Sequence, residues 1–135
     1  MSLSLIRRAL EKHLLAMAPV LPLAPENVPF TPTPGAPYQR VHLLPATPAN
    51  PTMGDGFYRE VGVFQVSLYY PQGTGPAAAQ TRAEAVRNYF PRGLLIPEGG
   101  ISTRVERTPA ISSGVPDGDR WCIHVSIQYS ADIFT

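Results

Sequence analysis

The sequence predicts a two-layer α+β fold, in which two helices pack on one face of a mostly antiparallel sheet of four or five strands. Two observations lead to this prediction. Apolar residues recur at helical spacing in two segments, and they alternate at strand spacing in several others. The expected order is α-β-β-β-α-β-β, with residues 1–135 in a single domain.

The first helix is expected in SLSLIRRALEKHLLAMAP, residues 2–19. Ser2 or Ser4 can cap its start, and Pro19 ends it. Its apolar stripe consists of Leu3, Ile6, Leu10, Leu14 and Met17. A proline-rich connection follows over residues 19–37, with a short strand expected around residues 26–30.

The next two strands are expected at residues 38–44 and 57–70. In the first, Val41 and Leu43 alternate with Arg40 and His42, which predicts one buried face. The second places four large side chains on one face: Phe64, Val66, Leu68 and Tyr70. Its opposite face still carries Val61 and Val63, so both faces are expected to be partly covered.

The second helix is expected in residues 76–91, with Pro76 in its first turn and Pro91 as its end. Its apolar stripe consists of Ala79, Ala83, Val86 and Phe90. Three charged residues are expected to face solvent, namely Arg82, Glu84 and Arg87.

The last two strands are expected around Ile101, Thr103 and Val105, and in WCIHVSIQY at residues 121–129. The latter gives the clearest pattern in the chain, because five successive odd positions are large and apolar. They are Trp121, Ile123, Val125, Ile127 and Tyr129. The preceding VPDGDR has the composition of a hairpin turn.

A loop at residues 45–56 is longer than most connections in compact domains, which are about 4–6 residues. Its prolines and glycines cannot pack into a core, so we expect it to be mobile in the free subunit and to order against a partner. The residues assigned to this interaction loop are Pro45, Pro48, Asn50, Pro51, Met53 and Asp55.

Charge and composition exclude several classes of function. The formal net charge is +1 with the basic residues scattered, which argues against nucleic-acid specificity. No segment approaches the ~20 apolar residues of a membrane span. A signal peptide is not expected either, because Glu11, Lys12 and His13 interrupt the apolar stretch near the N-terminus. A cytoplasmic protein is therefore expected.

The clearest candidates for chemistry are Cys122 and His124, which share a strand face, and His42 on a neighbouring strand. A thiolate nucleophile needs a base and a group that orients the base, and no carboxylate is evident for that role. The simpler interpretation is a polar sheet face. No metal site, cofactor site or catalytic motif is otherwise evident, so an enzyme is not expected; a small-molecule-binding domain or an enzyme using Cys122 and His124 remains an alternative.

Three phrases resemble phage tail terminator-like proteins, which are small proteins of long-tailed phages and prophages. They are IRRALEKHLLAMAP, YQRVHLLPATPANPTMGDGFYREVGVFQVSLYYPQGTGPAAAQTRAEAVRNYF and CIHVSIQYSADIF, and together they span nearly the whole chain. The resemblance implies an α+β structural protein that assembles as a ring, typically a hexamer. Such a ring caps the tail tube, ends its polymerisation and joins it to the head.

The implied partners are further copies of the chain, the tail tube protein and a head-completion or connector protein. The implied location is the virion tail, and the host cytoplasm during assembly. Another head–tail connector or minor tail component is the alternative within the same particle. Candidates for contacts between subunits are Arg59, Glu60, Val61, Val63, Arg82, Arg87 and Arg104, with Glu84 and Glu106 as further charged candidates.

Overall fold

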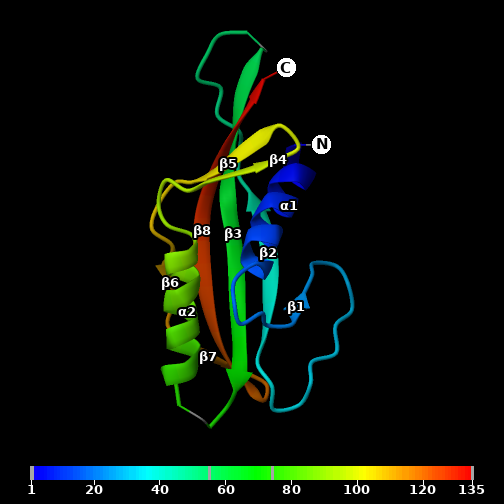
Figure 1. The fold of residues 1–135 in the computed structure, drawn as a ribbon, viewed down its shortest axis with the longest axis vertical. Coiled ribbons are helices and arrows are strands. Elements are labelled where there is room, and N and C mark those ends of the chain that lie inside the picture. The colour runs from blue at the N-terminus through cyan, green and yellow to red at the C-terminus, as the bar shows by residue number, and fades with distance from the viewer. Residues whose placement is uncertain (1, 55, 74, 135) are drawn as a thin grey trace.

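Two fifteen-residue strands, β3 (Phe57–Pro71) and β8 (Arg120–Phe134), form the centre of the sheet and run along the long axis (Figure 1). They are antiparallel and paired over their whole length. Both strands were predicted, and both extend beyond the predicted bounds. The structure is a computed structural model that describes residues 2–54, 56–73 and 75–134.

The remaining strands are short and flank this pair on both sides. They are β1 (Leu23–Ala24), β2 (Tyr38–Pro45), β4 (Leu95–Glu98), β5 (Ile101–Val105), β6 (Ala110–Ile111) and β7 (Val115–Asp117). The order across the sheet is β1-β2-β3-β8-β5-β4, while β6 and β7 also pair with β8. The pair β1–β2 is parallel, and every other pair is antiparallel.

The mixed α+β class with two helices is therefore confirmed, but the predicted sheet of four or five strands is too small. Among the described residues the sheet has eight strands, and five of them follow the second helix, where two were predicted. Four of these five contain two to five residues. β5 was predicted from Ile101, Thr103 and Val105, but β4, β6 and β7 are too short to show a readable alternation. The strand expected at residues 26–30 is also misplaced, because the observed β1 lies at Leu23–Ala24.

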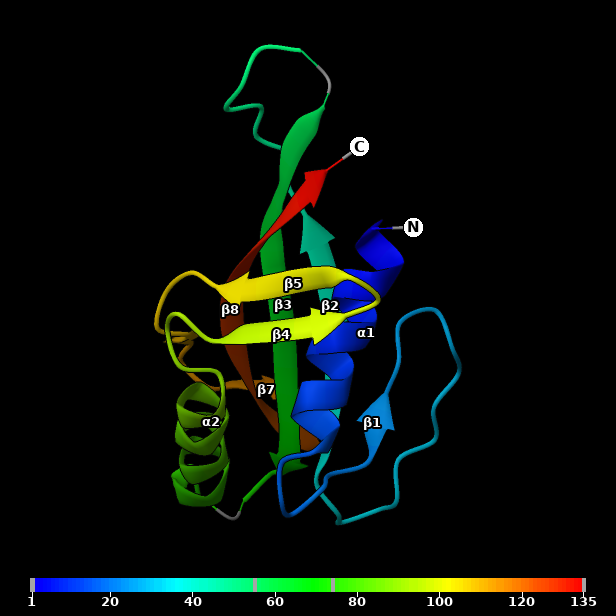
Figure 2. The same cartoon turned by 45° about the horizontal axis from the view of Figure 1, so that its top comes forward.

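Both helices, α1 (Ser2–Leu15) and α2 (Ala77–Tyr89), pack against the same face of the sheet, as predicted. The hairpin β4–β5 crosses this face, so the sheet curls around the core (Figure 2). The core combines residues from α1, α2, β2, β3 and β8. Its largest fully buried side chains include Ile6, Leu10, Leu14, Phe64, Leu68, Phe90, Ile123, Ile127 and Tyr129.

Two details of the predicted helices are wrong. Leu3 belongs to the predicted stripe but is 38% exposed, at the free end of α1. Arg82, expected to face solvent, is only 6% exposed. It is buried because the connection after α1 passes over that flank of α2, where Arg82 Nη1 donates a hydrogen bond of 2.6 Å to the Pro19 carbonyl oxygen.

Candidate interaction surfaces

The loop at residues 45–56 projects beyond the rest of the molecule at one end of the long axis (Figures 1 and 2). Each of its described residues is exposed, and Met53 is fully exposed. Pro45 is the last residue of β2, and Asp55 lies outside the described residues. We call residues 45–56 the projecting loop.

The base of the projecting loop is held by β-type hydrogen bonds. The amide and carbonyl of Ala49 pair with those of Arg59 at 2.8 Å each, and the Ala46 amide donates to the Val61 carbonyl oxygen. The loop therefore prolongs the hairpin β2–β3 as far as the pair Ala49–Arg59. This geometry presents the tip of the loop away from the core.

Two cross-strand side-chain pairs stabilise the ends of β3 and β8 beside the loop. The rings of Phe57 and Phe134 lie 5.0 Å apart, although Phe134 is 77% exposed. Arg59 Nε donates to Asp132 Oδ1 at 2.6 Å. Such directly opposite pairs stabilise antiparallel strands. This end of the molecule thus combines exposed apolar groups with a paired charge.

The predicted interface candidates fall into two groups. Arg59, Glu60, Val61 and Val63 lie on β3 and Arg104 on β5, so these five are near the end of the sheet that carries the projecting loop. Glu60 is buried there and accepts a hydrogen bond of 2.9 Å from the Ser2 hydroxyl. Val61 and Val63 line a shallow cavity of about 290 Å³ on the polar face.

The second group lies on α2. Arg87 Nε donates to the Pro109 carbonyl oxygen at 3.0 Å, which ties α2 to the segment before β6. Arg82 lines a cavity of about 510 Å³ with mostly apolar walls. Burial lowers the pKa of Arg82, and the nearby Tyr70 opposes that shift. The structure thus does not bring all the predicted candidates onto one surface.

The polar face of the sheet brings Cys122 and His124 together, as predicted. The Cys122 sulfur lies 3.8 Å from His124 Nε2, and the Ser67 hydroxyl lies 2.7 Å from His124 Nδ1. Gln65 Nε2 is the other neighbour of that ring, at 3.2 Å. His42 is on β2, directly opposite Gln65 on β3, so it lies one strand beyond Gln65 as seen from Cys122 and His124 on β8.

This cluster lacks the properties of a nucleophilic site. Burial raises the pKa of the Cys122 thiol, whereas a reactive cysteine needs a lowered one. Among the described residues, no carboxylate contacts His124, and no group of three or more His, Cys, Asp and Glu residues could hold a metal ion. The simpler interpretation of a polar sheet face fits this geometry.

Arg120 is an anchoring residue that the sequence did not reveal. It is 5% exposed, and its guanidinium donates to the carbonyl oxygens of Thr33, at 2.9 Å, and Ala36. Its Cζ also lies 5.1 Å from the ring centroid of Tyr38, which stacks on Tyr69. Arg120 therefore holds the proline-rich connection against the sheet. The partners lie more than 80 residues away in sequence, and no local pattern points to them.

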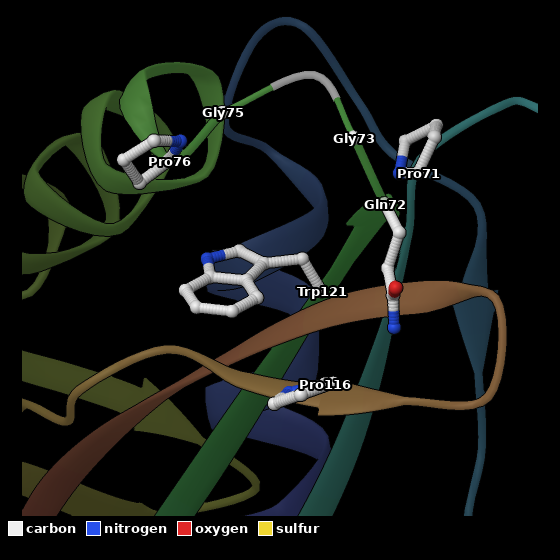
Figure 3. A pocket seen from close by; sticks show the side chains of 7 residues that line it. All are labelled: Pro71, Gln72, Gly73, Gly75, Pro76, Pro116 and Trp121. Carbon is white, nitrogen blue, oxygen red and sulfur yellow. The ribbon is translucent and has the colours of Figure 1, made fainter.

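A third cavity lies at the end of the molecule where β3 leads into α2 (Figure 3). Its volume is about 350 Å³, and Trp121 faces Pro76, Pro116 and Gln72 across it. Trp121 was expected to be a core residue but is only half-buried. The indole of Trp121 lies against Gly114, where an added Cβ would be 2.2 Å from the nearest ring atom. Of the helices that the structure describes, neither is long and apolar enough to cross a membrane.

Comparison with known proteins gives one family. A family profile described as phage tail terminator protein matches residues 5–129. Seven chains of solved structures match as well. One of them, which carries no functional name, is 31% identical and superposes with a TM-score of 0.79, covering 100% of this chain and 99% of its own. No curated protein sequence matches the chain.

Proposed function

The chain belongs to the phage tail terminator family and is thus a structural component of a phage tail, and we propose that its copies close a ring on the end of the tail tube. This ring ends tube polymerisation and offers the surface to which the head is joined. The family match over residues 5–129 is the observation that supports the proposal.

The shape of the subunit is compatible with this role. The chain presents different surfaces at its two ends. The projecting loop lies at one end (Figure 1), and cavities lined by residues at the start of α2 lie at the other. Contacts between unlike surfaces generate a closed ring when the rotation between subunits closes. A terminating ring must also bind the tube on one side and refuse a further tube subunit on the other.

In this proposal the projecting loop contacts a tube subunit or a neighbouring terminator. The prolines support the assignment, because they reduce the conformational freedom that the loop loses on binding. The exposed Met53 supplies apolar surface that the subunit alone leaves in water. The proposed partners are thus further copies of the chain, the tube protein and a head-completion or connector protein.

Shortening the projecting loop tests the proposal. Replacing residues 50–54 with two glycines should leave folding intact, since the described residues there are exposed and outside the core. Phages that carry this change should assemble tails of uncontrolled length. The matched control replaces Arg92 with alanine. Arg92 is exposed and lies between α2 and β4, away from the projecting loop. Tails of normal length in the loop variant would contradict the assignment, and heads that fail to join normal tails would favour a connector instead.

A further inference from the structure

A cavity of about 280 Å³ lies where the hairpin β4–β5 meets the last residues of β8. Two of the side chains that line it are apolar and exposed, Leu95 at 52% and Phe134 at 77%. Two others are charged, Asp132 and Arg104. Asp132 accepts a hydrogen bond of 2.6 Å from Arg59, whereas Arg104 is exposed and has no hydrogen-bond or ion-pair partner among the described residues. This cavity, which we call the Arg104 cavity, therefore offers one unpaired cation beside two exposed apolar side chains.

The walls of the Arg104 cavity define the chemistry of a partner. A guanidinium pairs well with a carboxylate, to which it donates charge-assisted hydrogen bonds. Exposed ion pairs contribute little on their own, so most of the affinity must come from apolar contact, while the charge selects the partner and its orientation. The expected partner is thus a carboxylate with an exposed apolar side chain next to it.

The turn between β7 and β8 has this composition. Val115, Pro116 and Asp117 form β7 and are all exposed, and Asp119 follows across the turn. Val115 is 45% exposed, and Asp117 has no hydrogen-bond or ion-pair partner in the part of the chain that the structure describes. The side chain of Asp119 is 88% exposed, and its Oδ1 lies 3.8 Å from Arg120 Nε. We call residues 115–119 the acidic turn.

Other carboxylates of the chain fit the Arg104 cavity less well. Apart from Asp117, Glu84 on α2 is the one carboxylate among the described residues that has neither a hydrogen bond nor an ion pair. No large apolar side chain described on α2 is exposed, so Glu84 lacks the apolar neighbour that the cavity calls for. The acidic turn is therefore the better match.

The acidic turn cannot reach the Arg104 cavity of its own chain. Asp117 pairs with Arg120, the first residue of β8, whereas Phe134 in the wall of the cavity is the last residue of that strand. Fifteen residues of extended strand span roughly 45 Å. The acidic turn and the hairpin β4–β5 accordingly lie apart along the long axis (Figure 1). The turn can therefore enter this cavity only in another copy.

We propose that the Arg104 cavity receives the acidic turn of a second copy of the chain, where Asp117 pairs with Arg104. Val115 then packs against Leu95 and Phe134. The assignment rests on the proposed ring and names a contact that closes it. Each subunit donates one turn and receives another, so the contact joins unlike surfaces and is heterologous.

Charge reversal tests the contact through self-association. The variants Arg104→Glu and Asp117→Lys are measured by sedimentation over a wide concentration range, each alone and as an equimolar mixture. Each variant alone should associate roughly tenfold or more weakly than the original chain, because like charges then meet. The mixture should recover association, because each cavity then meets a turn of opposite charge on the other variant. A mixture as weak as the single variants, or no loss in either variant alone, would overturn the assignment.

Two controls separate this contact from net charge and from folding. Arg92→Glu changes the net charge as Arg104→Glu does, at another exposed position, and should leave association unchanged; an equal loss would overturn the assignment. Because Asp117 lies opposite Arg120 across the turn, Asp117→Asn is measured as well, since it removes the charge without placing two cations together. It should weaken association by a smaller factor than Asp117→Lys. The urea midpoints of Arg104→Glu and Asp117→Asn should match that of the original chain, because both side chains are exposed and unpaired.

A chain that stays monomeric in solution is tested on purified tail tubes. The original chain should end tube elongation there, each single variant should fail to do so, and their mixture should succeed. Loss of capping that the mixture does not recover would overturn the contact and assign the cavity to an acidic group of a tail protein.

The contact and the proposed function fail in different ways. Capping by Arg104→Glu alone, as efficient as that of the original chain, would overturn the contact and leave the proposed function standing. Association that the mixture recovers, in a chain that never caps tubes, would do the reverse. A chain that neither associates nor caps tubes would overturn both.

Discussion

Gly62 on β3 lies directly opposite Tyr129 on β8, and the space that a side chain would need at Gly62 is occupied by the tyrosine hydroxyl. A Cβ at Gly62 would lie 2.6 Å from both the Tyr129 hydroxyl oxygen and the Leu44 carbonyl oxygen. Tyr129 is 1% exposed, its hydroxyl has no partner among the described residues, and burial raises its pKa to about 12. Gly62 thus lets a large ring enter the core where β2, β3 and β8 meet.

Gly62→Ala should lower the free energy of unfolding by about 1–3 kcal/mol, because the added methyl group overpacks this site. Urea unfolding measures the change. Gly56→Ala is the matched control, since a Cβ at Gly56 would meet nothing within 4 Å. Tyr129→Phe removes the hydroxyl and should restore part of the loss in the double variant. An unchanged urea midpoint for Gly62→Ala would show that the strands can move apart to admit the methyl group without a loss in the free energy of unfolding.

Arg120→Met should loosen the proline-rich connection, because it removes the donors to Thr33 and Ala36 and exposes their carbonyl groups to competition by water. We expect faster proteolytic cleavage within residues 25–37 and a loss of about 1–3 kcal/mol in stability. Limited proteolysis with mass spectrometry locates the cuts. Arg92→Met, at an exposed position, serves as the control, and equal cleavage rates in both variants would count against the anchoring role.

Glu26 links α1 to the edge of β2, since it accepts hydrogen bonds from the Leu43 amide at 2.5 Å and from Arg7 at 2.9 Å. Burial alone would raise its pKa, but these two bonds outweigh burial and lower the pKa below its usual value of 4.5. A carboxylate with a lowered folded-state pKa stabilises the fold above the unfolded-state pKa and loses this contribution as the pH falls through the folded-state value.

Glu26→Gln should therefore reduce the loss of stability on acidification below about pH 4.5. The effect at neutral pH should stay near or below about 1 kcal/mol, because both partners are partly exposed to solvent. Urea midpoints between pH 3 and 7 measure it. Identical pH profiles for the two proteins would mean that the contact contributes nothing to the folded state.

Cys122 should resist alkylation in the folded protein. The side chain is 2% exposed, and burial raises its pKa, so little thiolate is present and little of it is accessible. Mass spectrometry after treatment with iodoacetamide should show modification only once urea unfolds the chain. Rapid modification of the folded protein at neutral pH would instead favour the alternative of a site that uses Cys122 and His124.

The parts of the fold that could be predicted are those that follow from local sequence patterns, such as the spacing of apolar residues and prolines. The alternation from Trp121 to Tyr129 located β8 and most of its core face, and the prolines at 19 and 91 bounded the two helices. The short strands β4, β6 and β7 escaped prediction because each takes its conformation from pairing with β8 or β5, not from its own residues.

The candidate site was predictable only in part, for a related reason. The projecting loop follows from length and composition, which are local properties. The burial of Arg82 and Arg120 does not, because their partners are backbone carbonyl groups 63 to 87 residues away. Every residue type presents such carbonyl groups, so no side chain in the sequence marks the partner. An arginine on a helix flank has the sequence pattern of a solvated charge, and it is the connection after α1 that covers Arg82.

The most direct test of the central claim is the mass of the protein with and without purified tail tubes, measured by sedimentation across a wide concentration range. The account predicts a discrete ring-sized species with a central hole by negative-stain microscopy, either free in solution or at one end of each tube. Tubes capped in this way should no longer elongate when tube subunits are added. A chain that stays monomeric with tubes present, and leaves their elongation unchanged, would contradict the account.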